Sequence, residues 1–177
     1  MLFEALFGSS ERRCAEALYR SAAEQARAPT FFRALGVPDT VDGRFDLLVL
    51  HVFLLLRRLR REGAAGRRLG QRLFDTMFDH FDQALREMGV GDLGVGRRIK
   101  AMGQAMYGRA AAYDRALEAG QSALGSALAR NLFAQTPTQT ALGALTGYVL
   151  CAERLLAAQP AAALLKGRAV FPPAPEA

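Results

Sequence analysis

The sequence predicts an all-α protein, a single-domain bundle of about six to seven helices around a buried central helix. The first observation is the stretch Asp46–Arg61, in which the residues from Leu47 to Leu56 are all apolar except His51. This stretch is rich in leucine, apolar on every side, and shorter than the roughly 20 apolar residues that span a bilayer. The second observation is the helical spacing of apolar residues in most of the remaining chain, and the third is the lack of strand-type alternation.

The composition fits one globular domain. The chain has 177 residues, of which 51% are hydrophobic and 23% are charged, enough to bury a core. Its 23 basic and 17 acidic residues give a net charge of +6, and nearly all the basic residues are arginine. This balance favours anionic partners such as nucleic acid, a ribosome or an acidic membrane face, although an arginine-rich proteome would explain it equally well. Cys14 and Cys151 form no paired motif, which indicates a reducing compartment.

Residues 1–9 form an apolar N-terminal segment. Leu2, Phe3, Leu6 and Phe7 fall on one side of a short helix, where they would either pack on the core or form a docking or membrane-touching patch. The segment lacks the basic region of a secretory signal and the arginine content of a transit peptide. We therefore expect a cytoplasmic protein, at most peripheral to the inner membrane.

The helical domain is expected to span residues 10–166. Its first helix, 10–27, ends at Pro29, and a turn-rich connector, 36–43, leads into the central helix. The end of the central helix begins a basic region with seven arginines within sixteen residues, from 57 to 72. After a break at 62–66, the next helix, 68–88, carries an apolar stripe of phenylalanine and methionine at helical spacing, with an acidic face beside it.

A glycine-rich turn, 89–96, is expected to precede a basic helix that begins near Arg97 and ends at Gly120. Gly103 and Gly108 lie within this helix and cost about 1 kcal/mol each in helix propensity, so we expect another helix to cross closely there. A shorter helix marked by Leu124, Leu128 and Leu132 then stops before Thr136-Pro137, and a last long helix ends at Pro160. Residues 167–177 are rich in proline and are expected to form a disordered tail.

The glycine turn contains a literal GxGxxG at Gly89–Gly94. A dinucleotide-binding fingerprint needs a strand before it and a helix after it, and no βαβ unit is predicted here. The step Gly89-Val90-Gly91 fits a helix–hairpin–helix module better, because such a hairpin holds a DNA phosphate and the next helix adds basic groups. Arg97, Arg98 and Lys100 would supply these groups, although the acidic Asp92 counts against this alternative.

Enzyme chemistry finds little support in the sequence. Neither histidine has a glutamate three residues before it, as a di-iron bundle requires, and no serine or cysteine lies in a nucleophile elbow. His80 points about 100° away from Asp79 on a helix, which argues against a shared metal site. His51 is interpreted as a core histidine with its hydrogen bonds satisfied. We expect no cofactor, no metal and no small-molecule substrate.

Two segments carry a family resemblance: GVPDTVDGRFDLLVLHVFLLLRRL at Gly36–Leu59 and LREMGVGDLGVGRRIKAMGQAMYGRAAAYDRAL at Leu85–Leu117. Here the chain closely resembles the ubiquinol–cytochrome c chaperone family, and the resemblance extends over about Leu18 to Leu156. It implies an all-α, non-enzymatic assembly factor for ubiquinol–cytochrome c reductase. It further implies newly made cytochrome b or another subunit as the client, with the ribosome, an anionic membrane surface and a small partner protein as further candidate partners. Mitochondrial members commonly have tryptophan where this chain has Phe53.

A chaperone for a membrane protein needs an apolar groove bordered by charge. Methionine suits adaptable surfaces, so four methionines are candidates if their helices leave a cleft: Met77, Met88, Met102 and Met106. The predicted partner-binding residues combine the family's motif positions with the basic border, and are Asp92, Arg97, Arg98, Lys100, Tyr107, Arg109 and Tyr113. Core packing with a hydrogen-bonded hydroxyl is the alternative for the two tyrosines. A basic nucleic-acid-binding domain and a ligand- or metal-binding helical enzyme are the alternative functions.

Overall fold

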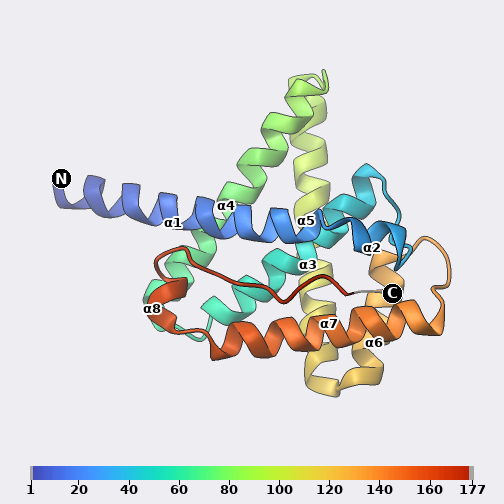
Figure 1. Ribbon diagram of the computed structural model, residues 1–177. Coiled ribbons are helices and arrows are strands. Elements are labelled where there is room, and N and C mark those ends of the chain that lie inside the picture. Colours follow the sequence, from blue (N-terminus) through green and yellow to red (C-terminus); the bar gives the residue numbers. More distant parts are fainter. Residues whose placement is uncertain (1, 176–177) are drawn as a thin grey trace.

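The fold is described from a computed structural model, in which the structure describes the backbone of residues 2–175 and the side chains of residues 10–175. Within these residues the chain forms eight helices and no strand (Figure 1). They are α1 (Leu2–Ala26), α2 (Pro29–Arg33), α3 (Val41–Leu59), α4 (Gly63–Glu87), α5 (Asp92–Ala119), α6 (Gln121–Leu132), α7 (Gln139–Ala158) and α8 (Ala161–Leu164). The predicted all-α class is confirmed.

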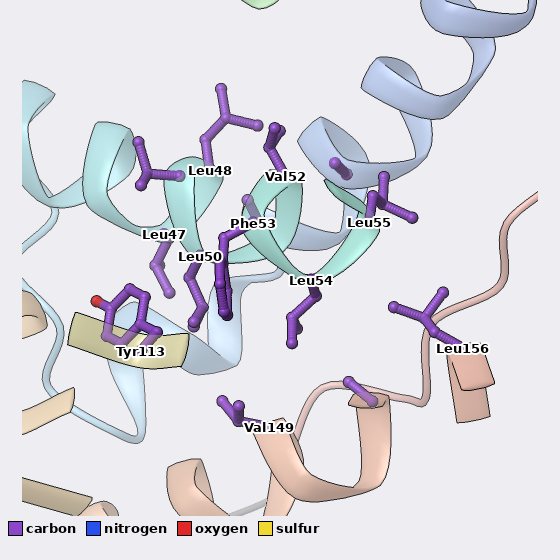
Figure 2. Packing of buried hydrophobic residues seen from close by; sticks show 14 of the residues in the cluster. Leu47, Leu48, Leu50, Val52, Phe53, Leu54, Leu55, Tyr113, Val149 and Leu156 are labelled. Carbon is purple, nitrogen blue, oxygen red and sulfur yellow. The ribbon is translucent and has the colours of Figure 1, made fainter. Parts of the chain in front are cut away.

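The central helix is α3, as the sequence predicted. It contacts α1, α4, α5, α6 and α7, and every residue from Leu47 to Leu55 is buried. Figure 2 shows Val149 and Leu156 of α7 pointing toward α3 from one side. Burying an apolar side chain of this size stabilises a fold by about 1.5–3 kcal/mol, so the leucine-rich run explains why the other helices assemble around α3.

Two capping threonines set where long helices begin. The Thr40 hydroxyl accepts a hydrogen bond from the Gly43 amide at 3.1 Å, at the start of α3. The Thr138 hydroxyl accepts one from the Ala141 amide at 3.2 Å, at the start of α7. Each hydroxyl satisfies an amide that has no partner inside its own helix. The cap at Thr40 therefore fixes the residue at which α3 begins, and with it the side chains of α3 that face the core.

Helices α4 and α5 form a long hairpin whose tip projects away from the other helices (Figure 1). Gly89 ends α4 with a φ of +80°, a conformation that favours glycine. The next helix then begins at Asp92, five residues before the predicted start at Arg97. An acidic side chain in the first turn is favoured by the helix dipole, and this outweighs the low propensity of the glycines that follow.

Helix α4 also begins earlier than predicted, at Gly63 rather than near residue 68, because the turn after α3 takes only three residues. Gly66 makes this turn possible: a Cβ atom there would lie 2.1 Å from the Leu59 carbonyl oxygen. Gly108 differs from the prediction, since a Cβ atom there would meet nothing within 4 Å. Within the described part of the chain no helix crosses closely at Gly108, so the expected packing role is wrong for that residue.

Much of the basic region around the end of α3 is used inside the fold. Arg58 is buried and donates to the Leu156 carbonyl at 2.9 Å and the Gln159 carbonyl at 3.1 Å. Arg57 is paired with Asp114 on α5 and lies 3.7 Å from Glu153 on α7. These arginines fasten the end of α3 to its neighbours, so they are not part of the anionic-partner surface that the sequence suggested.

The two ends of the chain were predicted to lie outside the helical domain. Backbone residues 2–9 continue α1, while the side chains of the expected apolar segment, 1–9, lie outside the described residues. The described part of the expected tail, 167–175, has no helix, as predicted, but runs between α1 and α7 (Figure 1). There the Gln25 amide donates to the Pro172 carbonyl at 2.9 Å. The boundary of the helical domain at residue 166 remains a prediction.

Candidate binding groove

A long groove opens where the projecting hairpin meets the rest of the bundle. It consists of two adjoining depressions of about 780 and 580 Å³. Both are lined by the start of α3, the end of α4 and the first half of α5, and the smaller one also reaches the end of α1. The residues common to the two are Val41, Phe45, Leu85, Met88 and Met102. The groove is therefore continuous and mainly apolar along its shared wall.

Two apolar residues of this groove are unusually exposed. Val41 is 70% exposed and Met88 is 57% exposed, although both belong to residue types that are normally buried. Met102 lies beside them and is half-buried. Two of the four predicted methionines, Met88 and Met102, thus line this groove, whereas Met77 and Met106 are buried. An exposed apolar groove with flexible methionines suits a partner that presents an apolar surface.

The floor of the groove is stiffened by aromatic rings. Phe45 of α3 packs against Phe81 of α4, with ring centroids 5.3 Å apart. At the α1 end, Tyr19 stacks on His80 with a centroid distance of 4.4 Å, and the His80 ring nitrogen lies 3.1 Å from Glu16. These contacts join α1, α3 and α4, so the apolar wall is a preformed surface.

An ion pair lies where α3 faces α5 along the groove. Arg109 Nη2 lies 2.8 Å from Asp46 Oδ1, and both side chains are largely buried. Burial raises the pKa of Asp46 to about 6, against the lowering effect of Arg109. The Arg109 guanidinium also lies over the Phe45 ring, 5.8 Å from its centroid. The groove therefore combines apolar walls with one polar anchor.

Tyr113 lies behind this anchor in the core. Its ring packs against Phe53 with centroids 5.6 Å apart, and burial raises the pKa of its hydroxyl, with Asp46 adding to the rise and Arg109 opposing it. The hydroxyl of Tyr113 and the ε nitrogen of Arg109 have no hydrogen-bond partner among the described residues. Both atoms are buried away from solvent, so they are unsatisfied polar atoms inside the fold and not contacts offered to a partner.

The structure disperses the predicted partner-binding residues. Arg98 and Arg109 line the groove, whereas Asp92 is at the hairpin tip and pairs with Arg86. Arg97 and Lys100 are exposed on the hairpin. Tyr107 is 66% exposed and lies outside the groove, whereas Tyr113 is fully buried. The contacts of all seven residues with a partner remain predictions.

Sequence reasoning missed the α3 side of the groove. Val41, Phe45 and Leu48 recur at helical spacing and extend the apolar face of α3 beyond its leucine-rich run. This spacing was the available signal, but Val41 lies in the turn-rich connector that we expected before the helix. The Asp46–Arg109 pair had no such signal, because its members are 63 positions apart by their residue numbers.

His51 lies in the core, as predicted, with both ring nitrogens paired. One nitrogen, Nδ1, lies 2.7 Å from the Leu47 carbonyl and the other, Nε2, lies 2.7 Å from the Tyr148 hydroxyl. A carbonyl only accepts, so Nδ1 donates and Nε2 accepts from Tyr148 when the ring is neutral. Burial lowers the pKa of His51 to about 4, and the ring is neutral at pH 7.

Within the part of the chain that the structure describes, no group of three or more His, Cys, Asp or Glu side chains is arranged to hold a metal ion. Among the same residues, α7 alone is long and apolar enough to cross a membrane. It buries Leu145, Val149 and Leu156 as part of the core and contacts α3 and α6, so one face of α7 belongs to the core.

Known proteins resemble this chain over most of its length. The profile of the ubiquinol-cytochrome C chaperone family matches residues 33–171. The crystal structure of the Cbp3 homologue from Brucella abortus superposes with a TM-score of 0.81 at 33% identity, covering 97% of this chain and 96% of that one.

Curated relatives are named ubiquinol-cytochrome-c reductase complex assembly factor 1. The Xenopus laevis protein is 27% identical over 115 residues, 65% of this chain and 58% of that protein. The Mus musculus protein is 28% identical over 118 residues, 67% of this chain and 40% of that protein. The alignments therefore span less than two thirds of these relatives.

Proposed function

Because this chain belongs to the ubiquinol–cytochrome c chaperone family, we propose that it binds newly made cytochrome b in the groove between α1, α3, α4 and α5. In this proposal the protein works at the face of the inner membrane and holds the client until ubiquinol–cytochrome c reductase is assembled. The family is one of assembly factors, which implies a non-enzymatic role.

The observation that carries the proposal is the exposed apolar wall of the groove. A newly made membrane protein presents apolar helices that aggregate in water, and a chaperone must cover part of that surface. Val41, Met88 and Met102 offer an apolar surface of this kind on a preformed floor. The Asp46–Arg109 pair adds an anchor for a polar group of the client. The groove can thus accept a segment that is mainly apolar and carries an occasional polar residue.

Further contacts belong to the same proposal. The exposed Arg97, Arg98 and Lys100 on the projecting hairpin are available to anionic lipid headgroups or to the ribosome. We favour this use over binding to free nucleic acid, because the turn that would hold a phosphate has the acidic Asp92 directly beside it. A small partner protein remains a further candidate.

The test replaces apolar residues of the groove by charge in the cell. We expect the double variant Val41→Asp and Met88→Asp, expressed in a strain that lacks the native gene, to lower the membrane content of cytochrome b and of assembled reductase. The reason is that two carboxylates on the apolar wall would be desolvated by a bound client. Immunoblots and difference spectra of the membranes measure both quantities.

A matched control is Val170→Asp, because Val170 is also an exposed valine, at 62%, but lies in the segment after α8. This variant should restore both quantities to the wild-type level. Cytochrome b and reductase at wild-type levels in the groove variant would show that the groove does not hold the client. Normal levels in the strain lacking the gene would exclude an assembly role altogether.

A further inference from the structure

A second, smaller opening lies on a different face of α5 from the groove. It is enclosed by the end of α3, the first half of α4 and the middle of α5, and has a volume of about 360 Å³. Its apolar lining residues come from all three helices and are Phe53, Leu56, Phe74, Met106 and Ala110, of which Phe53 and Met106 are almost fully buried. No residue lines both this pocket and the groove, so α5 forms a wall shared by two separate sites.

The charge of this pocket has one sign. Its charged lining residues are Arg60 and Arg67, and no aspartate or glutamate lines it. Arg67 is exposed and has no ion-pair partner among the described residues, while Arg60 is exposed and makes one long contact, 3.4 Å, with Asp114. An apolar depression rimmed by two accessible arginines is complementary to an apolar group that has an anionic group beside it.

Tyr107 gives the pocket an anchor of the type found at protein interfaces. It is 66% exposed, and its ring lies against Phe74 with centroids 5.5 Å apart. The next residue, Gly108, sits inside a helix with open space where a side chain would be. Glycine costs about 1 kcal/mol at such a position, and none of the described residues packs closely against it. A partner backbone could approach α5 closely at Gly108 and cover Tyr107.

We propose that this pocket binds an amphipathic helix of a partner protein, which inserts a large apolar side chain and places an aspartate or glutamate against Arg60 and Arg67. The volume is near the lower end of the roughly 300–1,000 Å³ of pockets that hold whole small ligands, which favours one or two side chains. Tyrosine and arginine dominate binding energy at protein interfaces, and both types meet here. The proposal stands independently of the client groove.

The experiment selects helical peptides from a displayed random library against the full-length protein, with counter-selection against the Tyr107→Ala variant. We expect the enriched peptides to carry an acidic residue one helical turn from a large apolar residue. A fluorescent synthetic copy of an enriched peptide should bind in an anisotropy titration. Its affinity should fall about tenfold or more on Tyr107→Ala and on Arg67→Glu, and should weaken as salt is raised.

Two matched variants distinguish this site from a general effect of charge or folding. Arg72→Glu changes an exposed arginine of the same helix that does not line the pocket, and Tyr107→Phe retains the ring, so both should bind within about threefold of wild type. The groove variant Val41→Asp with Met88→Asp should also bind normally. Failure to enrich peptides over the counter-selection, enrichment of peptides without acidic residues, or equal binding to Arg67→Glu would each overturn the proposal.

Discussion

At the scale of single residues, the core contains two titrating groups whose effects on stability oppose each other. His51 has a folded-state pKa of about 4 because it is buried, below the ordinary value of about 6.5. As the pH falls through about 6.5, the unfolded chain therefore binds a proton that the folded chain does not. The free energy of unfolding then decreases by up to about 1.4 kcal/mol per pH unit.

Asp46 acts in the other direction. Its folded-state pKa is raised to about 6 by burial, above the ordinary value of about 3.9. Between about pH 6 and pH 4 the folded chain therefore binds a proton that the unfolded chain lacks, and acidification stabilises the fold through this group. Because the two windows overlap, the contributions of His51 and Asp46 partly cancel in the native protein.

We predict that Asp46→Asn uncovers the contribution of His51. Between pH 6.5 and pH 5.0, the free energy of unfolding of this variant should fall more steeply with acidification than that of the native protein, because the opposing group is gone. Urea denaturation at intervals across this range measures the two profiles. Asp79→Asn removes an exposed carboxylate of α4 as a control, and parallel profiles for native protein and Asp46→Asn would contradict the assigned pKa values.

At the scale of elements, the sequence predicted those helices whose evidence is local. Helix α3 was predicted because its leucine-rich run is apolar on every side, and the caps and glycine turns are likewise short-range signals. The inward role of Arg58 could not be predicted, because its acceptors, the Leu156 and Gln159 carbonyls, are about 100 positions away by number. The surroundings of Gly108 could not be predicted either, since the sequence does not show whether a glycine in a helix faces a neighbouring helix or open space.

Gly66 and Gly108 give opposite predictions for the same substitution. Gly66→Ala should lower the free energy of unfolding, by about 1–3 kcal/mol, because its Cβ atom would meet the Leu59 carbonyl oxygen and the turn between α3 and α4 would have to move. Gly108→Ala should raise the free energy of unfolding by about 1 kcal/mol, because its Cβ atom meets nothing and alanine is the better helix former.

Denaturant titration of both glycine variants with circular dichroism provides the measurement. Each variant is the control for the other, since both replace a helical glycine by alanine. Equal effects on the free energy of unfolding would mean that the close approach at Gly66 is absent in solution. A loss of stability in Gly108→Ala would mean that α5 has an intramolecular neighbour there.

At the scale of the whole molecule, α5 is the helix that the two proposed binding sites share. One side of it faces the groove through Arg98, Met102 and Arg109, and another faces the smaller pocket through Met106 and Tyr107. The anchor Arg109 and the exposed Tyr107 are two positions apart on one rigid helix. Sequence spacing placed these residues on one helix, but the sites depend on how α1, α3 and α4 pack around it, which arises from contacts between distant segments.

The segment after α8 also contributes to the packing of the whole molecule, and here the prediction from composition differs from the structure. Composition predicts a disordered tail, but the described residues 167–175 contact α1, α3 and the end of α7. The Gln159 side chain exchanges two hydrogen bonds with Val170, at 2.7 and 2.9 Å, and the Phe171 ring packs against His51 at 5.3 Å between centroids. The segment thus covers the histidine that links α3 to α7.

We predict that truncation after Lys166 lowers the free energy of unfolding by about 2–4 kcal/mol, because the packing of Phe171 is lost together with the three hydrogen bonds that join this segment to the side chains of Gln25 and Gln159. Truncation should also uncover His51, so that its pKa rises toward the ordinary value and the loss of stability on acidification becomes shallower. Urea denaturation at pH 7 and pH 5 measures both effects, and Phe171→Ala should give part of each. Unchanged stability and an unchanged pH profile in the truncated protein would mean that the segment is a free tail, and that α3 and α7 shield His51 on their own.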